Sequence, residues 1–235
     1  MTAARDDQNK NEKKSTVTEQ INQFFQKHRK VLLIGFLSAV LILAGLIIGI
    51  TVRDKIQAKN LSKVDGFNRR YLELKNSQNF EDSEAAAKQI DIVVLLVELD
   101  DFAKKSSGFP AARAFSISGD ILADQKNWAN AEEAYLNAAK AAGKSYFAPL
   151  NFFNAAVAAE ERGDIDSAVV HYQKALDFGN IFPAAARAMF SIGRLEESRN
   201  NKLAAMASYS LVMAKWPEEQ LWANLAQSRM IALSE

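Results

Sequence analysis

The sequence predicts an all-α protein in which a single N-terminal transmembrane helix is followed by a stack of antiparallel helix pairs. The first observation behind this prediction is an uncharged, apolar segment of 22 residues between Lys30 and Arg53. The second is a pattern of large apolar, small and aromatic residues that recurs every 37 residues after Gly108. Between these two regions, apolar residues keep the spacing of three and four that is typical of helices.

The chain before the apolar segment divides into a polar tail and a short amphipathic segment. Residues 1–15 are polar and of mixed charge, which predicts a disordered tail. In residues 16–30, Val17, Ile21 and Phe24 fall at helical spacing with polar residues opposite them. This pattern predicts an amphipathic juxtamembrane helix whose aromatic face lies among the lipid headgroups. A simple extension of the transmembrane helix explains the same spacing equally well.

Residues 31–52 form the predicted transmembrane helix. As a helix they rise about 33 Å, which is enough to cross a hydrocarbon core of about 30 Å. A signal peptide has a shorter apolar core and a small-x-small cleavage site, whereas this segment runs directly into Arg53 without such a site. The segment is therefore expected to remain as an uncleaved anchor in the lipid bilayer. Within it, Gly45 and Gly49 are candidates for close contact with another membrane helix.

Basic residues flank the predicted span on both sides. Five precede it and six follow it within the roughly twenty residues that decide orientation. The downstream flank belongs to a long domain, and long domains cross membranes largely regardless of their charge. The expected topology is therefore single-pass with a cytoplasmic N-terminus.

The segment between the span and the repeats, residues 53–107, is predicted to be a helical stalk followed by an atypical N-terminal helix pair. Apolar residues such as Val64, Phe67 and Tyr71 keep helical spacing as far as Asn76. Residues 92–97 are continuously apolar and could, taken alone, be a buried strand. The Ala-rich sequence before them and the basic residues after them favour a helix.

Residues 108–217 contain three units of the 37-residue repeat. The first predicted helix of each unit carries a large apolar residue and, four positions later, a small one. The second carries a small residue, an aromatic four positions later and a small or branched residue three positions further on. A small residue on the first helix lets the second helix cross it closely, and the aromatic residue on the second helix is predicted to fill the gap between neighbouring pairs. In that order, the members are Phe115, Phe152 and Met189; Gly119, Ala156 and Gly193; Ala131, Ala168 and Ala205; Tyr135, Tyr172 and Tyr209; Ala138, Ala175 and Val212.

These residues resemble the tetratricopeptide repeat (TPR), which implies a right-handed stack of antiparallel helix pairs with an extended inner face for partners. The resemblance covers residues 109–217, although the period of 37 residues exceeds the usual period of about 34. Residues 218–235 place Leu221 and Trp222 on one side of a predicted helix, which is expected to cap the open end of the stack.

The composition argues against several classes of function. The chain has no cysteine, and its two histidines, His28 and His171, are far apart, so no metal-ligand pattern is present. Its 29 basic and 28 acidic residues leave no strongly basic domain of the kind that nucleic-acid binders carry. Adjacent carboxylates such as Glu132 and Glu133 point about 100° apart on a helix and do not form acid–base pairs. We expect no enzyme, no cofactor, no nucleic acid and no small-molecule substrate.

The inner face of a repeat stack is lined mainly by the first helix of each unit. Phe153 and Phe190 stand beside residues that already fill the core, so an apolar groove edged by arginines is predicted to hold an extended or helical segment of another protein. Packing of both phenylalanines on the preceding pair as extra core is the alternative. The predicted partner-binding residues are Arg113, Ser116, Asp120, Leu150, Phe153, Val157, Arg187, Phe190 and Arg194.

The whole layout is similar to that of the YfgM family of ancillary subunits of the bacterial Sec translocon. The similarity lies in Gln23, Phe24 and Phe25 before the span, in the helical stalk after it and in the Ala-rich repeats. It implies an inner-membrane protein whose C-terminal domain lies in the periplasm. The implied partners are the SecYEG translocon, a PpiD-like membrane-anchored chaperone and exported polypeptides on their way to periplasmic chaperones. A structural scaffold for another cell-envelope complex is the alternative, and a cytoplasm-facing adaptor is a third if the orientation is reversed.

Overall fold

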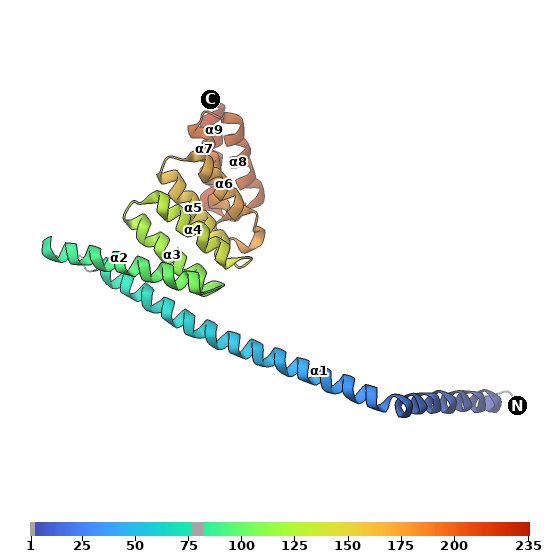
Figure 1. Cartoon of the computed structure of the whole chain (residues 1–235). Coiled ribbons are helices and arrows are strands. Elements are labelled where there is room, and N and C mark those ends of the chain that lie inside the picture. Colours follow the sequence, from blue (N-terminus) through green and yellow to red (C-terminus); the bar gives the residue numbers. More distant parts are fainter. Residues whose placement is uncertain (1–2, 77–81) are drawn as a thin grey trace. The chain divides into compact units, whose positions relative to one another are not determined.

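The computed structural model describes residues 3–76 and 82–235, and every regular element among them is helical, which confirms the all-α prediction. The chain divides into two compact units, Met1–Gln57 and Ala58–Glu235, and each is described by itself. Helix α1 (Ala3–Asn76) makes up the first unit and contributes its last turns to the second. Figure 1 shows the paired helices α3 to α9 of the second unit following one another along a stack.

The first unit contains the apolar segment, which lies entirely within α1. Among the residues that the structure describes, this is the one helix that is long and apolar enough to cross a membrane. Its large side chains are exposed, with Phe36 and Leu41 each at 69 %. A helix that is apolar all round and exposed is what a membrane span requires. A Cβ atom added at Gly45 or Gly49 would meet no heavy atom within 4 Å, so the side of the helix at both glycines is open.

Helix α1 begins at Ala3, although the sequence predicts a disordered tail over residues 1–15. Met1 and Thr2 lie outside the described residues. The predicted juxtamembrane helix, residues 16–30, is continuous with the span, as the alternative interpretation expected. The physical reason is that residues 3–30 contain no Pro or Gly and include many Lys and Gln residues, which carry little cost in a helix.

The second unit begins with the last turns of α1, which pack against α2 (Asp82–Lys105). Helix α2 includes the apolar residues 92–97, so these are helical and not a strand. Leu95 and Leu99 are fully buried in the same core cluster as Val64. The rings of Phe67 and Phe102 meet edge to face at 5.6 Å between centroids, which fastens the two helices together.

Six further helices form three consecutive pairs, and a ninth follows them in the described part of the chain. Each helix packs mainly on its neighbours in sequence. A short 3₁₀ turn, η1 (Gly179–Ile181), lies between the second and third pairs. The helices are α3 (Phe109–Asp124) and α4 (Trp128–Ala142), α5 (Phe147–Glu161) and α6 (Ile165–Leu176), α7 (Ala185–Ser198) and α8 (Lys202–Lys215), and finally α9 (Gln220–Ser234).

The turn inside each pair is built at equivalent positions of the repeat. Lys126, Gly163 and Asn200, which are spaced by 37 residues, all have a positive φ of 58–82°. Such a left-handed residue ends a helix and lets the N–H groups that follow it donate to the helix's last, otherwise unpaired carbonyls. The N–H of Asn127 donates to the carbonyl of Leu122 at 2.8 Å, and the later turns repeat this bond. The sequence repeat therefore extends to the turns.

Within a pair, the aromatic ring of the second helix lies against the small residue of the first, whereas the repeat pattern predicted this ring in the gap between neighbouring pairs. A Cβ atom added at Gly119 would lie 2.6 Å from the ring of Tyr135, and one at Gly193 would lie 2.6 Å from the ring of Tyr209. Both distances are shorter than carbon atoms tolerate without movement. Glycine at these positions is therefore a packing requirement that lets the tyrosine ring lie against the backbone of the first helix.

Candidate protein-binding surfaces

The nine residues predicted to face partners lie on α3, α5 and α7. Seven of them are exposed or half-buried. Ser116 and Phe153 are buried, with 8 % and 6 % of their surface exposed. The Phe153 ring lies 5.2 Å from that of Tyr172 and 6.1 Å from that of Phe182, so it packs in the core. These two residues therefore support the fold, and the other seven keep accessible surface.

Phe190 and Arg187 are the members of the predicted face best placed to contact a partner. The half-buried ring of Phe190 lies 5.3 Å from the ring of Tyr209 and 5.5 Å from that of Trp222. Arg187 is exposed, and its guanidinium carbon lies 5.0 Å from the centroid of Phe153. Because Arg187 has no ion-pair partner among the described side chains, its charge is available to an acidic group on a partner.

The other cations of the predicted face are tied to carboxylates of the neighbouring helix pair. Arg194 bonds Glu160 at 2.5 Å between Nη2 and Oε1, and the Tyr172 hydroxyl donates to the same carboxylate at 3.2 Å. Arg113 lies 3.7 Å from Asp65 on α1. These contacts hold one helix pair against the next, so Arg113 and Arg194 have structural partners before any ligand arrives.

The same triad of tyrosine, carboxylate and arginine recurs one repeat later. The Tyr209 hydroxyl donates to Glu197 at 2.9 Å, and the Nε of Arg229 on α9 donates to that carboxylate at 3.1 Å. The hydrogen bond from Arg229 lowers the pKa of Glu197. Burial and the nearby carboxylate raise the pKa of Tyr209 to about 12, so its hydroxyl stays protonated and donates at neutral pH.

Asp120, also predicted to face partners, instead accepts a hydrogen bond from the Tyr135 hydroxyl at 2.8 Å. Burial raises the pKa of its carboxyl above the ordinary value for aspartate. Asp120 therefore belongs to the tyrosine-carboxylate series within the first pair.

A hollow of about 430 Å³ opens beside the predicted face at its C-terminal end. It includes two of the predicted residues, Phe190 and Arg194, and combines aromatic surface with charged groups. This is the kind of surface on which an aromatic or aliphatic side chain of a partner can be held. The lining residues are Phe190, Arg194, Glu197, Ser198, Tyr209 and Arg229.

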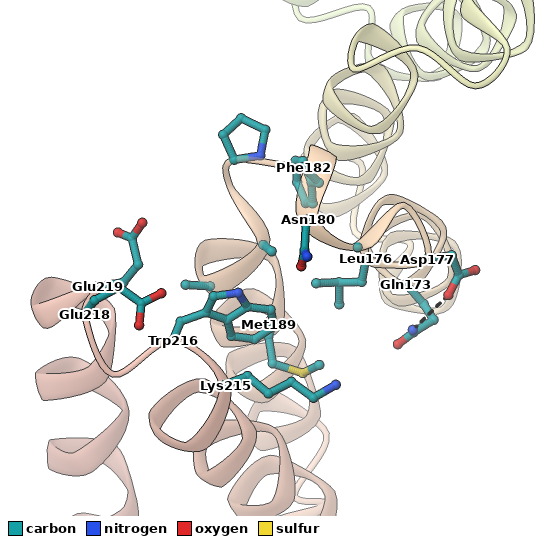
Figure 2. A pocket seen from close by; sticks show the side chains of 14 residues that line it. Gln173, Leu176, Asp177, Asn180, Phe182, Met189, Lys215, Trp216, Glu218 and Glu219 are labelled. Atoms are coloured by element: carbon teal, nitrogen blue, oxygen red, sulfur yellow. Dashed lines mark hydrogen bonds between the residues drawn. The ribbon is translucent and has the colours of Figure 1, made fainter.

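A larger hollow of about 670 Å³ lies between the second and third helix pairs, and the sequence did not predict it. Its floor includes Met189 and the half-buried indole of Trp216. Figure 2 shows these two side chains between Glu218 and Glu219 on one side and Asp177 on the other. The hollow is therefore apolar at its centre and acidic at its edges.

A buried polar cluster joins the first and second helix pairs on α4 and α6. Glu132, only 8 % exposed, accepts a hydrogen bond from Arg162 Nη2 at 2.8 Å. Its other oxygen lies 3.0 Å from Nε2 of His171, whose Nδ1 is buried without a hydrogen-bond partner in the structure. Sequence patterns do not predict the contact of His171 with Glu132, because residues 39 apart carry no local signal of contact.

In the part of the chain that the structure describes, no group of three or more His, Asp or Glu side chains could hold a metal ion. The polar contacts found above join helices to one another. The groups of the repeat domain that can contact other molecules are therefore the exposed aromatic, aliphatic and charged side chains on the surface of the helix stack.

Comparison with known proteins gives one informative similarity. No family model matches the chain. The chain is similar to a TPR repeat-containing protein of Treponema pallidum (strain Nichols), with 32 % identity over 225 residues. The match covers 91 % of this chain and 93 % of that protein, so it includes the long N-terminal helix as well as the helix pairs.

Proposed function

Because this chain belongs to the TPR repeat-containing proteins, we propose that it is a non-enzymatic factor that binds other proteins and is anchored in a membrane by α1. TPR domains are interaction modules whose stacked helices present extended surfaces. The observation that carries the proposal is the combination, in one chain, of an exposed apolar helix long enough to span a bilayer and a helix stack with open, aromatic-lined hollows.

The more specific proposal is an ancillary subunit of the SecYEG translocon. In this role the repeat domain lies in the periplasm, beside a PpiD-like chaperone, and assists the handover of exported polypeptides to periplasmic chaperones. The order of segments along the chain supports it, as does Arg187, whose charge is unpaired within the described residues on the face predicted for partners.

Topology and co-purification test this proposal together. The full chain is fused at its C-terminus to alkaline phosphatase or to a fluorescent protein. Because the phosphatase folds only outside the cytoplasm and the fluorescent protein only inside, we expect an active phosphatase and no fluorescence. Purified in mild detergent, the full chain is then expected to bring down SecY. Fluorescence of the one fusion together with an inactive phosphatase in the other contradicts the periplasmic assignment. Phosphatase activity without SecY, together with a different defined complex, supports an envelope scaffold instead.

A further inference from the structure

We infer that the hollow between the second and third helix pairs binds a polypeptide segment in which a large apolar side chain stands between basic residues. The inference rests on the proposed function as a protein-binding factor and names the chemistry of one of its partners. The hollow lies outside the nine residues predicted from the repeat.

The hollow exists because the junction between these two pairs is built differently from the preceding one. Helix α6 ends at Leu176 and α7 begins only at Ala185, whereas α4 and α5 are separated by four residues, 143–146. At the earlier junction, the rings of Phe152 and Phe178 lie 6.1 Å apart. The positions 37 residues further on carry Met189 and Lys215. The flexible thioether of Met189 and the ammonium of Lys215 thus stand where the preceding repeat has two phenyl rings, so space remains between the helices.

The centre of the hollow suits an apolar anchor. Phe182 and Met189 are 3 % and 8 % exposed and form a fixed floor, against which the half-buried Trp216 lies. The volume of about 670 Å³ falls within the usual range for sites that hold small ligands or single large side chains. An indole at such a site can contact both an apolar side chain and a neighbouring cation.

The edges of the hollow suit basic residues. Asp177, Glu218 and Glu219 are exposed, and none of them forms an ion pair with another described residue. Asp177 accepts only a 3.3 Å hydrogen bond from Gln173. Lys215 is the single cation among the lining residues. One repeat earlier in the sequence, the positions equivalent to these three acids are occupied by Lys140, Ile181 and Phe182, so the acidic edge does not recur with the repeat.

The placement of the acids indicates a ligand longer than a single ion. Figure 2 shows Asp177 and the pair Glu218 and Glu219 on opposite sides of Trp216. No three acidic side chains among the described residues are grouped as metal ligands. A polypeptide segment with a central Phe or Leu and flanking Lys or Arg can pack its apolar side chain on the floor and place its cations beside the acids at both edges. The opposite charges of segment and hollow would also speed association.

The test uses the full chain in nanodiscs of neutral lipid and a fluorescent heptapeptide, acetyl-Lys-Lys-Phe-Leu-Phe-Lys-Lys-amide, with fluorescence anisotropy as the readout and empty nanodiscs as the blank. We expect saturable binding, and at least a tenfold weaker binding of the peptide in which Glu replaces each Lys. Replacing two exposed carboxylates in Glu218→Gln/Glu219→Gln should weaken binding of the Lys peptide about threefold to tenfold.

A matched variant, Glu133→Gln/Glu161→Gln, changes the charge equally at exposed positions away from the hollow and should bind as the wild type does. Asn180→Trp, at an exposed position on the rim, should obstruct the hollow and abolish binding. Equal binding of the charge-reversed peptide, or unchanged binding by both the Glu218/Glu219 and Asn180 variants, overturns the inference. Absence of peptide binding from a chain that still brings down SecY overturns the inference alone and leaves the proposed function standing.

Discussion

Arg162 and Arg199 occupy equivalent positions of the repeat, 37 residues apart, and make different contacts. Arg162 reaches Glu132, which is buried and also contacts His171, at the junction of the first and second pairs. Arg199 reaches Asp166, whose side chain is 90 % exposed, at the junction of the second and third pairs. The charged contacts at the first junction thus reach a buried carboxylate, whereas those at the second are more exposed and lie beside an open hollow.

This difference shows how one repeat can serve two purposes. The small, aromatic and apolar positions recur and set the helix pairs. The residues at the other positions decide whether the junction between two pairs is closed, without a hollow, or open, with a hollow beside it. Hydrogen bonds to a buried carboxylate constrain the relative placement of two helices, whereas exposed ion pairs constrain it little. We therefore expect the first junction to be rigid and the second to be the one that accepts a ligand.

The largest effect is expected from Glu132→Ala at the closed junction. The substitution leaves His171 buried without its partner and should lower the free energy of unfolding by about 3 kcal/mol. Urea denaturation followed by circular dichroism measures the change. The adjacent, exposed Glu133→Ala is the control and should shift stability by no more than about 0.5 kcal/mol. Equal effects of the two substitutions would show that the buried cluster does not fasten the junction.

A smaller loss is expected inside the third pair from Gly193→Ala. The new methyl group would lie 2.6 Å from the Tyr209 ring, and moving that ring should cost about 1–2 kcal/mol. Gly66→Ala is the matched control, because its Cβ atom meets nothing within 4 Å in the middle of α1. It should raise stability by about 0.5–1 kcal/mol through helix propensity. Stabilisation by both substitutions would contradict the close contact of glycine and tyrosine.

At the C-terminal end of the stack, the contact of Arg229 with Glu197 should depend on pH. Because Arg229 lowers the folded-state pKa of Glu197, the contribution is present above the unfolded-state pKa and is lost as pH falls through the lower, folded-state pKa. Both side chains are partly exposed, so the contribution is under about 1 kcal/mol. Arg229→Gln should therefore be less stable than wild type at pH 7. The difference should shrink in strong acid, and a constant difference would count against the ion pair.

The smallest effect is expected from Arg199→Ala at the open junction. Its hydrogen-bond partner Asp166 is almost fully exposed and the contact of Arg199 with Glu196 is long, at 3.7 Å, so the loss should stay below about 0.5 kcal/mol. The equivalent substitution Arg162→Ala should be clearly more damaging, because it removes a hydrogen bond from buried Glu132. Thermal unfolding of the two variants side by side measures the contrast, and similar losses would remove the distinction between the junctions.

Much of the fold followed from the sequence because the repeat positions are also packing positions. Gly119 and Gly193 were predicted to let the second helix of their pair cross closely, and in the structure each lies against a tyrosine ring of that helix. The positive φ of Lys126 was not predicted, because neither its residue type nor its neighbours indicate a left-handed turn. The tail was expected to be disordered from its polarity, yet its residue types are good helix formers.

The candidate sites were harder to predict, because a 37-residue period states which residues are equivalent but not where each helix stops. Phe153 was predicted to face partners, yet the ring of Phe182, from the long connection after α6, covers it. The same connection leaves the hollow around Trp216. The length of a connection is set by small differences in where helices end, and sequence patterns locate helix ends only to within a residue or two.

The most direct test of the difference between the two junctions is to locate where a bound peptide lies. The Lys-rich heptapeptide, carrying a benzophenone in place of its central Leu, is photo-crosslinked to the full chain in nanodiscs, and the attachment sites are mapped by mass spectrometry. We predict attachment within residues 176–189 and 215–219, which include the lining of the open hollow, and none within residues 139–152, which are equivalent to 176–189 at the earlier junction. Equal labelling of the two junctions, or labelling confined to the earlier one, would contradict the account.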